Sequence, residues 1–118
     1  MVDFVVALSA YAKSKKPDFL IFPQNGEILL ENPRYLAAVD GIGKEDLFYT
    51  GDENSHPNTK PEIGDSMKQL KRAAAAGKLV LTVEYLTNLR HIRDYRKQAS
   101  NAGFLTYVAH RSLEILER

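Results

Sequence analysis

Gly77-Lys78-Leu79-Val80-Leu81-Thr82-Val83-Glu84-Tyr85 is the stretch that decides the fold, because a glycine that ends a helix is followed by a continuous apolar strand. The same order recurs where the helical stretch from Arg96 to Gly103 leads into the run from Phe104 to His110. The two strands start at residues 79 and 104, which are 25 residues apart. This is about the length of a strand plus a crossover helix, so the repeat predicts parallel strands joined by helices.

The rest of the chain supplies further elements of the same α/β pattern. Helical spacing of small apolar side chains at the start of the chain is closed by Pro17. An apolar run without alternation follows, as expected of a strand that is buried on both faces. Turn-forming residues and two prolines mark a long loop near the middle. The expected elements are a helix over 2–15, strands over 19–22, 36–39, 79–84 and 104–108, and a loop over 51–61.

Length and composition favour one domain over residues 1–118. The 118 residues are 44% hydrophobic, which is enough for one buried core. The formal net charge is +1, so no global field attracts nucleic acid or anionic lipid. The longest apolar runs are strand-sized, and we expect no membrane span. Absence of cysteine excludes disulfides, thiolate metal sites and a cysteine nucleophile.

Several motifs suggest cofactor, metal or nucleic-acid sites, but each is better explained as an ordinary structural feature of the fold. Gly41-Ile42-Gly43-Lys44 lacks the spacing of a phosphate loop and is followed by two acids. The basic stretch from Arg90 to Lys97 contains one aromatic residue and reads as a solvated helix face. His91 and Asp94 are one helical turn apart, but no third metal ligand has a recognised spacing. We therefore expect no metal, no cofactor and no nucleic acid.

Polar residues follow the predicted strands, where α/β proteins place their ligands. Gln24, Asn25, Asp40, Glu84 and His110 stand at or just after the expected strand ends. Both doubly wound sheets and barrels bind ligands at the carboxyl ends of their strands. His110 suits a hydrogen-bonded structural role as well as a catalytic one.

Two carboxylates carry the strongest chemical signal. Glu84 ends a nearly apolar strand, where a buried acid is costly without a partner. A salt bridge that fixes neighbouring loops explains it as well as a site role does. Glu45 and Asp46 are expected in a loop and are followed by Leu47-Phe48-Tyr49, and such apolar and aromatic surroundings suit a general acid.

Four motifs in order resemble glycoside hydrolase family 114, the endo-α-1,4-polygalactosaminidase-like proteins, some of which carry the label "cysteinyl-tRNA synthetase-related". The motifs are Asp18-Phe-Leu-Ile-Phe-Pro-Gln-Asn-Gly26, Ala38-Val-Asp-Gly-Ile-Gly-Lys-Glu-Asp-Leu-Phe-Tyr49, Gly77-Lys-Leu-Val-Leu-Thr-Val-Glu-Tyr85 and Ala102-Gly-Phe-Leu-Thr-Tyr-Val-Ala-His-Arg111. The resemblance implies a TIM-type (β/α)8 barrel that cleaves α-linked galactosamine-rich polysaccharide with two carboxylates. A whole barrel needs about 250 residues, so this chain is expected to supply a half-barrel, strands five to eight.

The resemblance also implies roles for particular residues. Glu45 matches the acid/base position after strand six, while the strand-four aspartate nucleophile has no counterpart in this chain. Gln24 and Asn25 are expected to hydrogen-bond sugar hydroxyls, and Tyr49 and Tyr85 to stack on pyranose faces. Glu84 is expected to hold sugar hydroxyls or to tune the acid/base. These substrate-binding assignments compete with simple capping of strand ends.

Two other interpretations remain open. A non-catalytic carbohydrate-binding or structural module would keep the sheet and a sugar-facing surface without hydrolysis. A nucleotide-binding doubly wound domain lacks the Gly-rich loop that it needs. The resemblance suggests an exported protein, although the start of the chain shows no export signal. An open half-barrel exposes two sheet edges, so we expect a homodimer or association with a complementing N-terminal half, without hydrolysis by the isolated chain.

Overall fold

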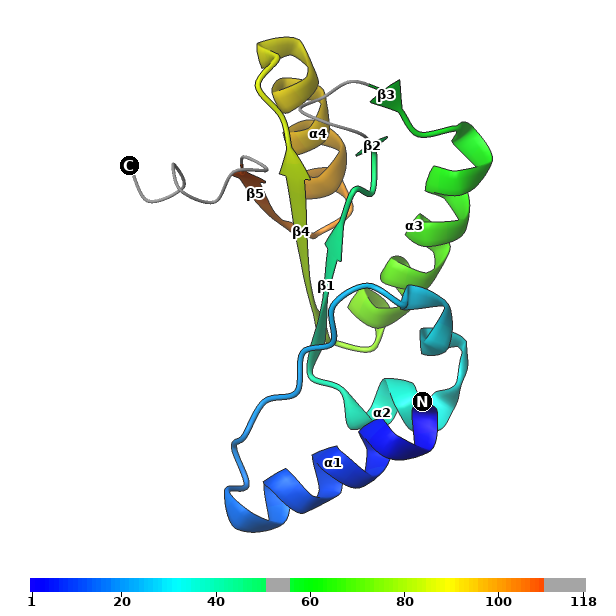
Figure 1. The fold of residues 1–118 in the computed structure, drawn as a ribbon, viewed down its shortest axis with the longest axis vertical. Helices are drawn as coiled ribbons and strands as arrows, with labels where there is room; N and C mark the ends of the chain where they lie inside the picture. Colours follow the sequence, from blue (N-terminus) through cyan, green and yellow to red (C-terminus); the bar gives the residue numbers. More distant parts are fainter. Residues whose placement is uncertain (51–55, 110–118) are drawn as a thin grey trace.

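The computed structural model describes residues 1–50 and 56–109. Helices alternate with strands along most of the chain, which confirms the predicted α/β class (Figure 1). The helical elements are α1 (Val2–Lys15), the 3-10 helix η1 (Glu27–Glu31), α2 (Pro33–Ala38), α3 (Lys60–Ala75) and α4 (Leu89–Asn101). The strands are β1 (Gly41–Glu45), β2 (Tyr49–Thr50), β3 (His56–Pro57), β4 (Leu79–Tyr85) and β5 (Leu105–Ala109).

The main sheet has the strand order β1-β4-β5 and both of its pairs are parallel. Gly41 pairs with Leu79 at its start, and β5 joins from Leu105, which pairs with Leu81. The predicted parallel pairing of the last two strands is therefore confirmed, and their bounds differ by one residue from those expected. β2 and β3 form a separate antiparallel pair beyond the end of β1 (Figure 1).

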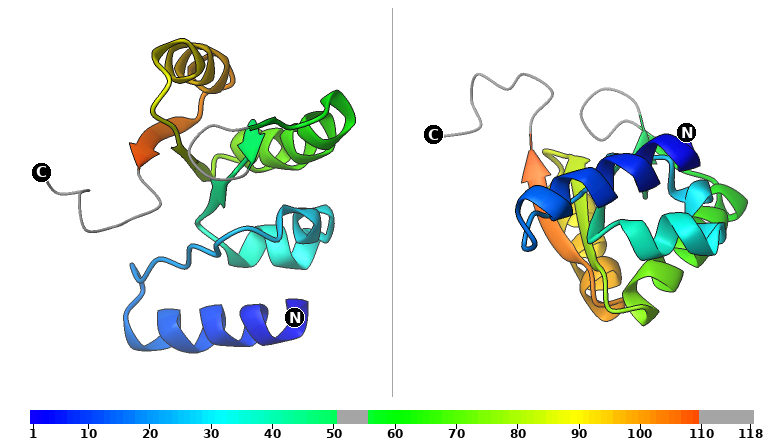
Figure 2. Two further views of the ribbon diagram at one scale, coloured as in Figure 1. Left: turned by 45° about the horizontal axis from the view of Figure 1, so that its top comes forward. Right: turned by 90° about the horizontal axis from the view of Figure 1, so that it is seen from below.

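The two faces of this sheet differ in what covers them. Val80, Thr82 and Glu84 point toward α3 and α4 and are buried. The opposite face carries large apolar side chains that stay exposed, at 53% for Leu79 and 54% for Leu105. Figure 2 shows α3 and α4 on one side of the strands. A parallel sheet is normally covered on both faces, whereas within residues 1–50 and 56–109 only one face of this sheet is covered by helices, and we call the other the bare face.

The expected strand over 19–22 is an extended segment that lies beside β1. Asp40 N–H donates to the carbonyl of Ile21 at 2.9 Å, and Gly43 N–H donates to that of Pro23 at 2.8 Å. Gln24 forms a parallel bridge with Gly43. The expectation of burial on both faces was wrong, because Leu20 is 62% exposed and Phe22 is 41% exposed on the bare side.

The expected strand over 36–39 was also wrong, because these residues belong to the end of helix α2 and to the turn that follows it. Asn32 caps this helix, with its side chain accepting from Arg34 N–H at 2.9 Å and from Tyr35 N–H at 3.4 Å. Pro33 occupies the first helical turn, where its missing N–H costs nothing. The strand comes later, as β1, so the residues expected in a loop after Asp40 are β-structure.

The predicted helix over 2–15 is confirmed as α1. Of the loop expected over 51–61, residues 51–55 lie outside the described ranges, His56–Pro57 form β3, and α3 begins at Lys60. Thr59 and Glu62 form a reciprocal capping box that fixes this start. No helix within residues 1–50 or 56–109 combines the length and the apolar composition that a bilayer span requires.

Tyr95 of α4 is buried in the core between the sheet and the helices, and its hydroxyl forms hydrogen bonds there. Its ring is fully buried and contacts Phe48 with centroids 5.9 Å apart. Its hydroxyl accepts from Tyr107 N–H at 3.1 Å and donates to the carbonyl of Thr82 at 2.9 Å. One α4 side chain therefore joins β4 to β5 through their backbones.

Candidate functional site

Glu45 is the last residue of β1, not a loop residue as expected, and three neutral side chains surround it. Tyr85 donates its hydroxyl hydrogen to Glu45 Oε2 at 3.1 Å, and Gln24 Nε2 reaches the same oxygen at 3.4 Å. Asn25 Oδ1 accepts from the backbone N–H of Glu45 at 3.1 Å. Four of the six residues predicted for the site thus meet in one group, which we call the Glu45 cluster: Gln24, Asn25, Glu45 and Tyr85.

The Glu45 cluster lies at the carboxyl end of the parallel strands and on the bare face. Glu45 pairs with Val83, and paired residues in a parallel sheet point to the same side. Tyr85 is two residues further along β4 and therefore faces the same way. This is the end at which α/β folds place ligands.

Two glycines make room for the cluster. A Cβ on Gly43 would lie 2.7 Å from Gln24 Oε1, and a Cβ on Gly41 would overlap the ring of Phe22. The side chains of the extended segment therefore lie across β1, where ordinary residues would exclude them. Asn25 takes the left-handed conformation (φ 58°), and Gly26 follows with φ 69°. This turn ends the extended segment beside Glu45.

Glu84 lies on the other face of β4, away from the Glu45 cluster. It is fully buried, and its Oε2 accepts from the backbone N–H groups of Leu47 and Phe48 at 2.9 Å each. Oε1 accepts from Tyr49 N–H at 3.4 Å. Burial raises the pKa of Glu84 to about 7, although the three N–H groups act in the opposite direction. Glu84 fixes the loop after β1, as its structural interpretation foresaw, through backbone hydrogen bonds instead of a salt bridge.

Tyr49 also lies on the helix side. It is buried, its ring stacks on His91 with centroids 4.6 Å apart, and its hydroxyl donates to Asp94 Oδ2 at 3.3 Å. Burial raises the pKa of Tyr49, and the charge of Asp94 adds to this effect. The ring is thus occupied by a protein partner and is not part of the Glu45 cluster.

Asp40 stands at the start of β1, opposite to the expected strand end. It accepts from Ile21 N–H at 2.7 Å and pairs with Lys13 Nζ at 2.8 Å. The hydrogen bond from Lys13 is the main reason that the pKa of Asp40 is lowered. This contact fastens α1 to the sheet. His110 lies outside the described residues.

No group of three or more His, Asp or Glu side chains suited to a metal occurs within residues 1–50 and 56–109. Asp94 instead accepts from Gln98 Nε2 at 2.7 Å as well as from Tyr49. The arginines of α4 and Lys97 are exposed, as predicted for a solvated helix face, whereas His91 is half-buried against Tyr49.

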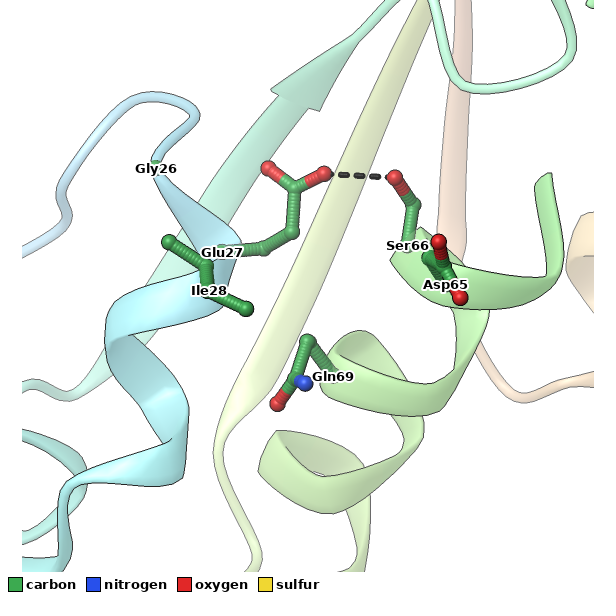
Figure 3. A pocket seen from close by; sticks show the side chains of 6 residues that line it. All are labelled: Gly26, Glu27, Ile28, Asp65, Ser66 and Gln69. Carbon is green, nitrogen blue, oxygen red and sulfur yellow. Dashed lines mark hydrogen bonds between the residues drawn. The ribbon is translucent and has the colours of Figure 1, made fainter. Parts of the chain in front are cut away.

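A supporting contact that the sequence interpretation missed lies behind the cluster, in a pocket between η1 and α3. Figure 3 shows Glu27 pointing toward Ser66, whose hydroxyl donates to Glu27 Oε2 at 2.6 Å. Lys44 Nζ pairs with the same oxygen at 3.1 Å. Burial alone would raise the pKa of Glu27, but the hydrogen bonds from Ser66, from the backbone N–H of Glu27 and from Lys44 together lower it. Strand alternation could have indicated this contact, because the side chain of Lys44 must point to the opposite face of β1 from that of Glu45.

Comparison with known proteins finds relatives without a described activity. No family model matches the chain. A protein of Methanocaldococcus jannaschii is 36% identical over 128 residues, covering 99% of this chain and 36% of its own length. Proteins of Thermotoga maritima and Deinococcus radiodurans are each 32% identical, with 38% and 37% of their lengths covered. All three are named only as uncharacterized. The chain therefore spans somewhat more than a third of the length of these relatives.

Proposed function

We propose that this chain is part of a glycoside hydrolase that acts on α-1,4-linked galactosamine-rich polysaccharide, with Glu45 as general acid/base. The observation that carries the proposal is the Glu45 cluster, in which a strand-end carboxyl on an open face accepts hydrogen bonds from the neutral donors Gln24 and Tyr85. The substrate class comes from the family resemblance of the motifs. The barrel that this family implies would use this chain for strands five to eight.

The hydrogen bonds indicate which oxygen of Glu45 acts. Both Gln24 and Tyr85 reach Oε2, so that oxygen is held by the protein. Oε1 is left as the atom that carries the proton to the leaving glycosidic oxygen and later removes a proton from water. Tyr85 is then a positioning residue as well as a sugar contact, and Asn25 fixes the backbone from which Glu45 extends.

Hydrolysis by this route needs a second carboxyl. In a retaining enzyme that group attacks the anomeric carbon from about 5 Å away from the acid/base. The bare face leaves room for a further part of the barrel opposite Glu45. The relatives are long enough for this, since about two thirds of each lies beyond the region that matches this chain.

The test uses a joined protein, in which this chain replaces the matching segment of the Methanocaldococcus jannaschii relative. The joined protein should release oligosaccharides from polygalactosamine, and Glu45→Gln should reduce kcat at least ~100-fold, as loss of a general acid does. The matched control is Asp18→Asn, the same carboxyl-to-amide change at an exposed position. Equal activity of Glu45→Gln and the control would remove Glu45 from the mechanism.

A non-catalytic carbohydrate-binding module is the second candidate. It is favoured by the neutral character of the groups that contact Glu45, since Gln24, Asn25 and Tyr85 suit sugar hydroxyls and a pyranose face. The module predicts that the 118-residue chain binds galactosamine oligosaccharides and loses binding in Tyr85→Ala, whereas the joined protein does not hydrolyse them.

A further inference from the structure

We propose that Glu84 is a positioning residue for Glu45, because its buried carboxyl group anchors the chain segment that leaves the Glu45 cluster. The catalytic meaning of this inference rests on the proposed function. The anchor itself rests on geometry: a fully buried carboxyl group accepts three successive backbone N–H groups from residues 47–49.

The anchored segment begins two residues after Glu45. Between them, Asp46 takes the left-handed conformation (φ 57°), and its N–H donates to the carbonyl of Val83 at 3.3 Å. A non-glycine residue is held in this conformation at a cost, so the surrounding contacts must fix it. The turn at Asp46 carries the chain from the bare face, where Glu45 points, to the helix face, where Glu84 binds it.

Two consecutive residues of β4 therefore hold Glu45 from both faces of the sheet. Tyr85 contacts the carboxyl group of Glu45, and Glu84 fixes the backbone that follows. Asn58 completes the support, since its Nδ2 donates to the carbonyls of Asp46 and Leu47 at 2.9 Å each. The loop has its N–H groups tied to Glu84 and its carbonyls tied to Asn58.

Above its pKa of about 7 the ionised carboxyl group suits this position, because its two acceptor oxygens serve three N–H groups. Glutamine offers one acceptor oxygen, and its NH2 group would meet backbone N–H groups as a second donor. Glu84→Gln should therefore release part of the segment without a large change in side-chain volume. Glu84→Asp keeps both oxygens but draws them back by one methylene, so it should retain part of the anchor.

The first measurement is amide hydrogen exchange in the 118-residue chain, monitored by NMR above pH 7, where Glu84 is ionised. Glu84→Gln should speed exchange at Leu47, Phe48 and Tyr49 about 5-fold, the factor that corresponds to the loss of a hydrogen bond worth roughly 1 kcal/mol. The Glu45 side-chain carboxyl 13C shift should move as well. Asp18→Asn should change neither. If Glu84→Gln does not fold, the same measurements on Glu84→Asp decide. Unchanged exchange or an unchanged Glu45 shift overturns the proposal.

The second measurement uses the joined protein. Glu84→Gln should lower kcat by up to about 100-fold, the effect of misplacing a catalytic group, while KM changes little. Glu84→Asp should recover part of kcat. Rapid amide exchange with normal kcat would overturn the positioning role. If the joined protein hydrolyses nothing, the proposed function fails, and the exchange and Glu45 shift still decide whether Glu84 positions Glu45.

Discussion

At the scale of single residues, Glu84 makes the stability of the fold depend on pH. Its pKa is about 7 in the folded chain against 4.5 ordinarily, so between these values the folded chain keeps a proton that the unfolded chain releases. The stabilisation is complete below pH 4.5 and is lost as pH rises through 7. We expect this residue to lower the free energy of unfolding by up to about 3 kcal/mol over that range, at 1.36 kcal/mol per pKa unit.

The measurement is urea unfolding of the wild type and of Glu84→Gln at several pH values between 4 and 8. The variant should lack the fall that Glu84 causes, and Asp18→Asn should retain it. Identical pH dependence in the wild type and Glu84→Gln would show that Glu84 does not take up the proton.

The two glycines of β1 should differ in their tolerance of alanine. A Cβ at Gly41 meets both the Phe22 ring and the backbone oxygen of Leu79 at 2.7 Å, whereas a Cβ at Gly43 meets the mobile end of Gln24. We expect Gly41→Ala to lose about 1–3 kcal/mol in the free energy of unfolding, as overpacked sites do. Gly43→Ala should lose less stability and should displace Gln24 from Glu45. Thermal unfolding tests the order, which is contradicted if Gly43→Ala is the less stable variant.

Gln24 and Asn25 could be predicted from the sequence because they follow an apolar run, whereas Glu45 and Tyr85 were assigned from the motifs, and Glu45 was expected in a loop. The expectation that Glu84 and Tyr49 lie beside these residues was wrong, because both face the helices. Glu84 and Tyr85 are neighbours in one strand, so they must point to opposite faces, and only one of them can face a given site. The sequence did not reveal which face the helices cover. The face on which Tyr49 lies depends on the turn at Asp46, and the local sequence does not predict that turn.

At the scale of elements, Tyr95 is the side chain that joins α4 to both β4 and β5. Tyr95→Phe removes the hydroxyl that bridges the carbonyl of Thr82 and the N–H of Tyr107. Leaving a buried polar group without its partner costs about 1–3 kcal/mol, and we expect a loss of that size in the free energy of unfolding. Tyr11→Phe is the control, because Tyr11 is exposed. Equal stability of the two variants would show that the bridge contributes nothing.

The elements that the sequence predicted well are those with long helical or apolar runs, such as α1, β4 and β5. The error at residues 36–39 came from the apolar run Leu36 to Val39, which outweighed the helix start at Asn32-Pro33. The strand β1 was missed because glycines normally weaken strands. Here they are required by the side chains of Phe22 and Gln24, which cross the strand from a segment distant in sequence.

At the scale of the whole molecule, the bare face and the open sheet edge lie side by side, and both favour association with another chain. Pro23 and Asn25 form backbone hydrogen bonds with Gly43, so the backbone N–H and C=O groups of Gln24 point away from β1. Because backbone direction alternates along an extended segment, the N–H and C=O groups of Phe22 and Leu20 also point away from β1. Their side chains lie on the bare face, where Leu81 is 37% exposed and Tyr107 is 46% exposed. An outward-facing parallel edge beside an exposed apolar face recruits further strands.

We therefore expect the isolated chain to self-associate as a homodimer in which two open sheets close against each other. Light scattering after size-exclusion chromatography should give twice the 13.3 kDa of the single chain. Leu81→Lys should shift the dimer toward monomer, because a charge on the bare face cannot be buried without a partner. Leu89→Lys is the control, since Leu89 is 76% exposed but lies at the start of α4, away from that face. A monomer at high concentration would refute the dimer, and equal dissociation in both variants would place the contact elsewhere. The dimer would bring two copies of Glu45 together without supplying the second carboxyl that the proposed mechanism needs, so we expect polygalactosamine to remain uncleaved by the isolated chain.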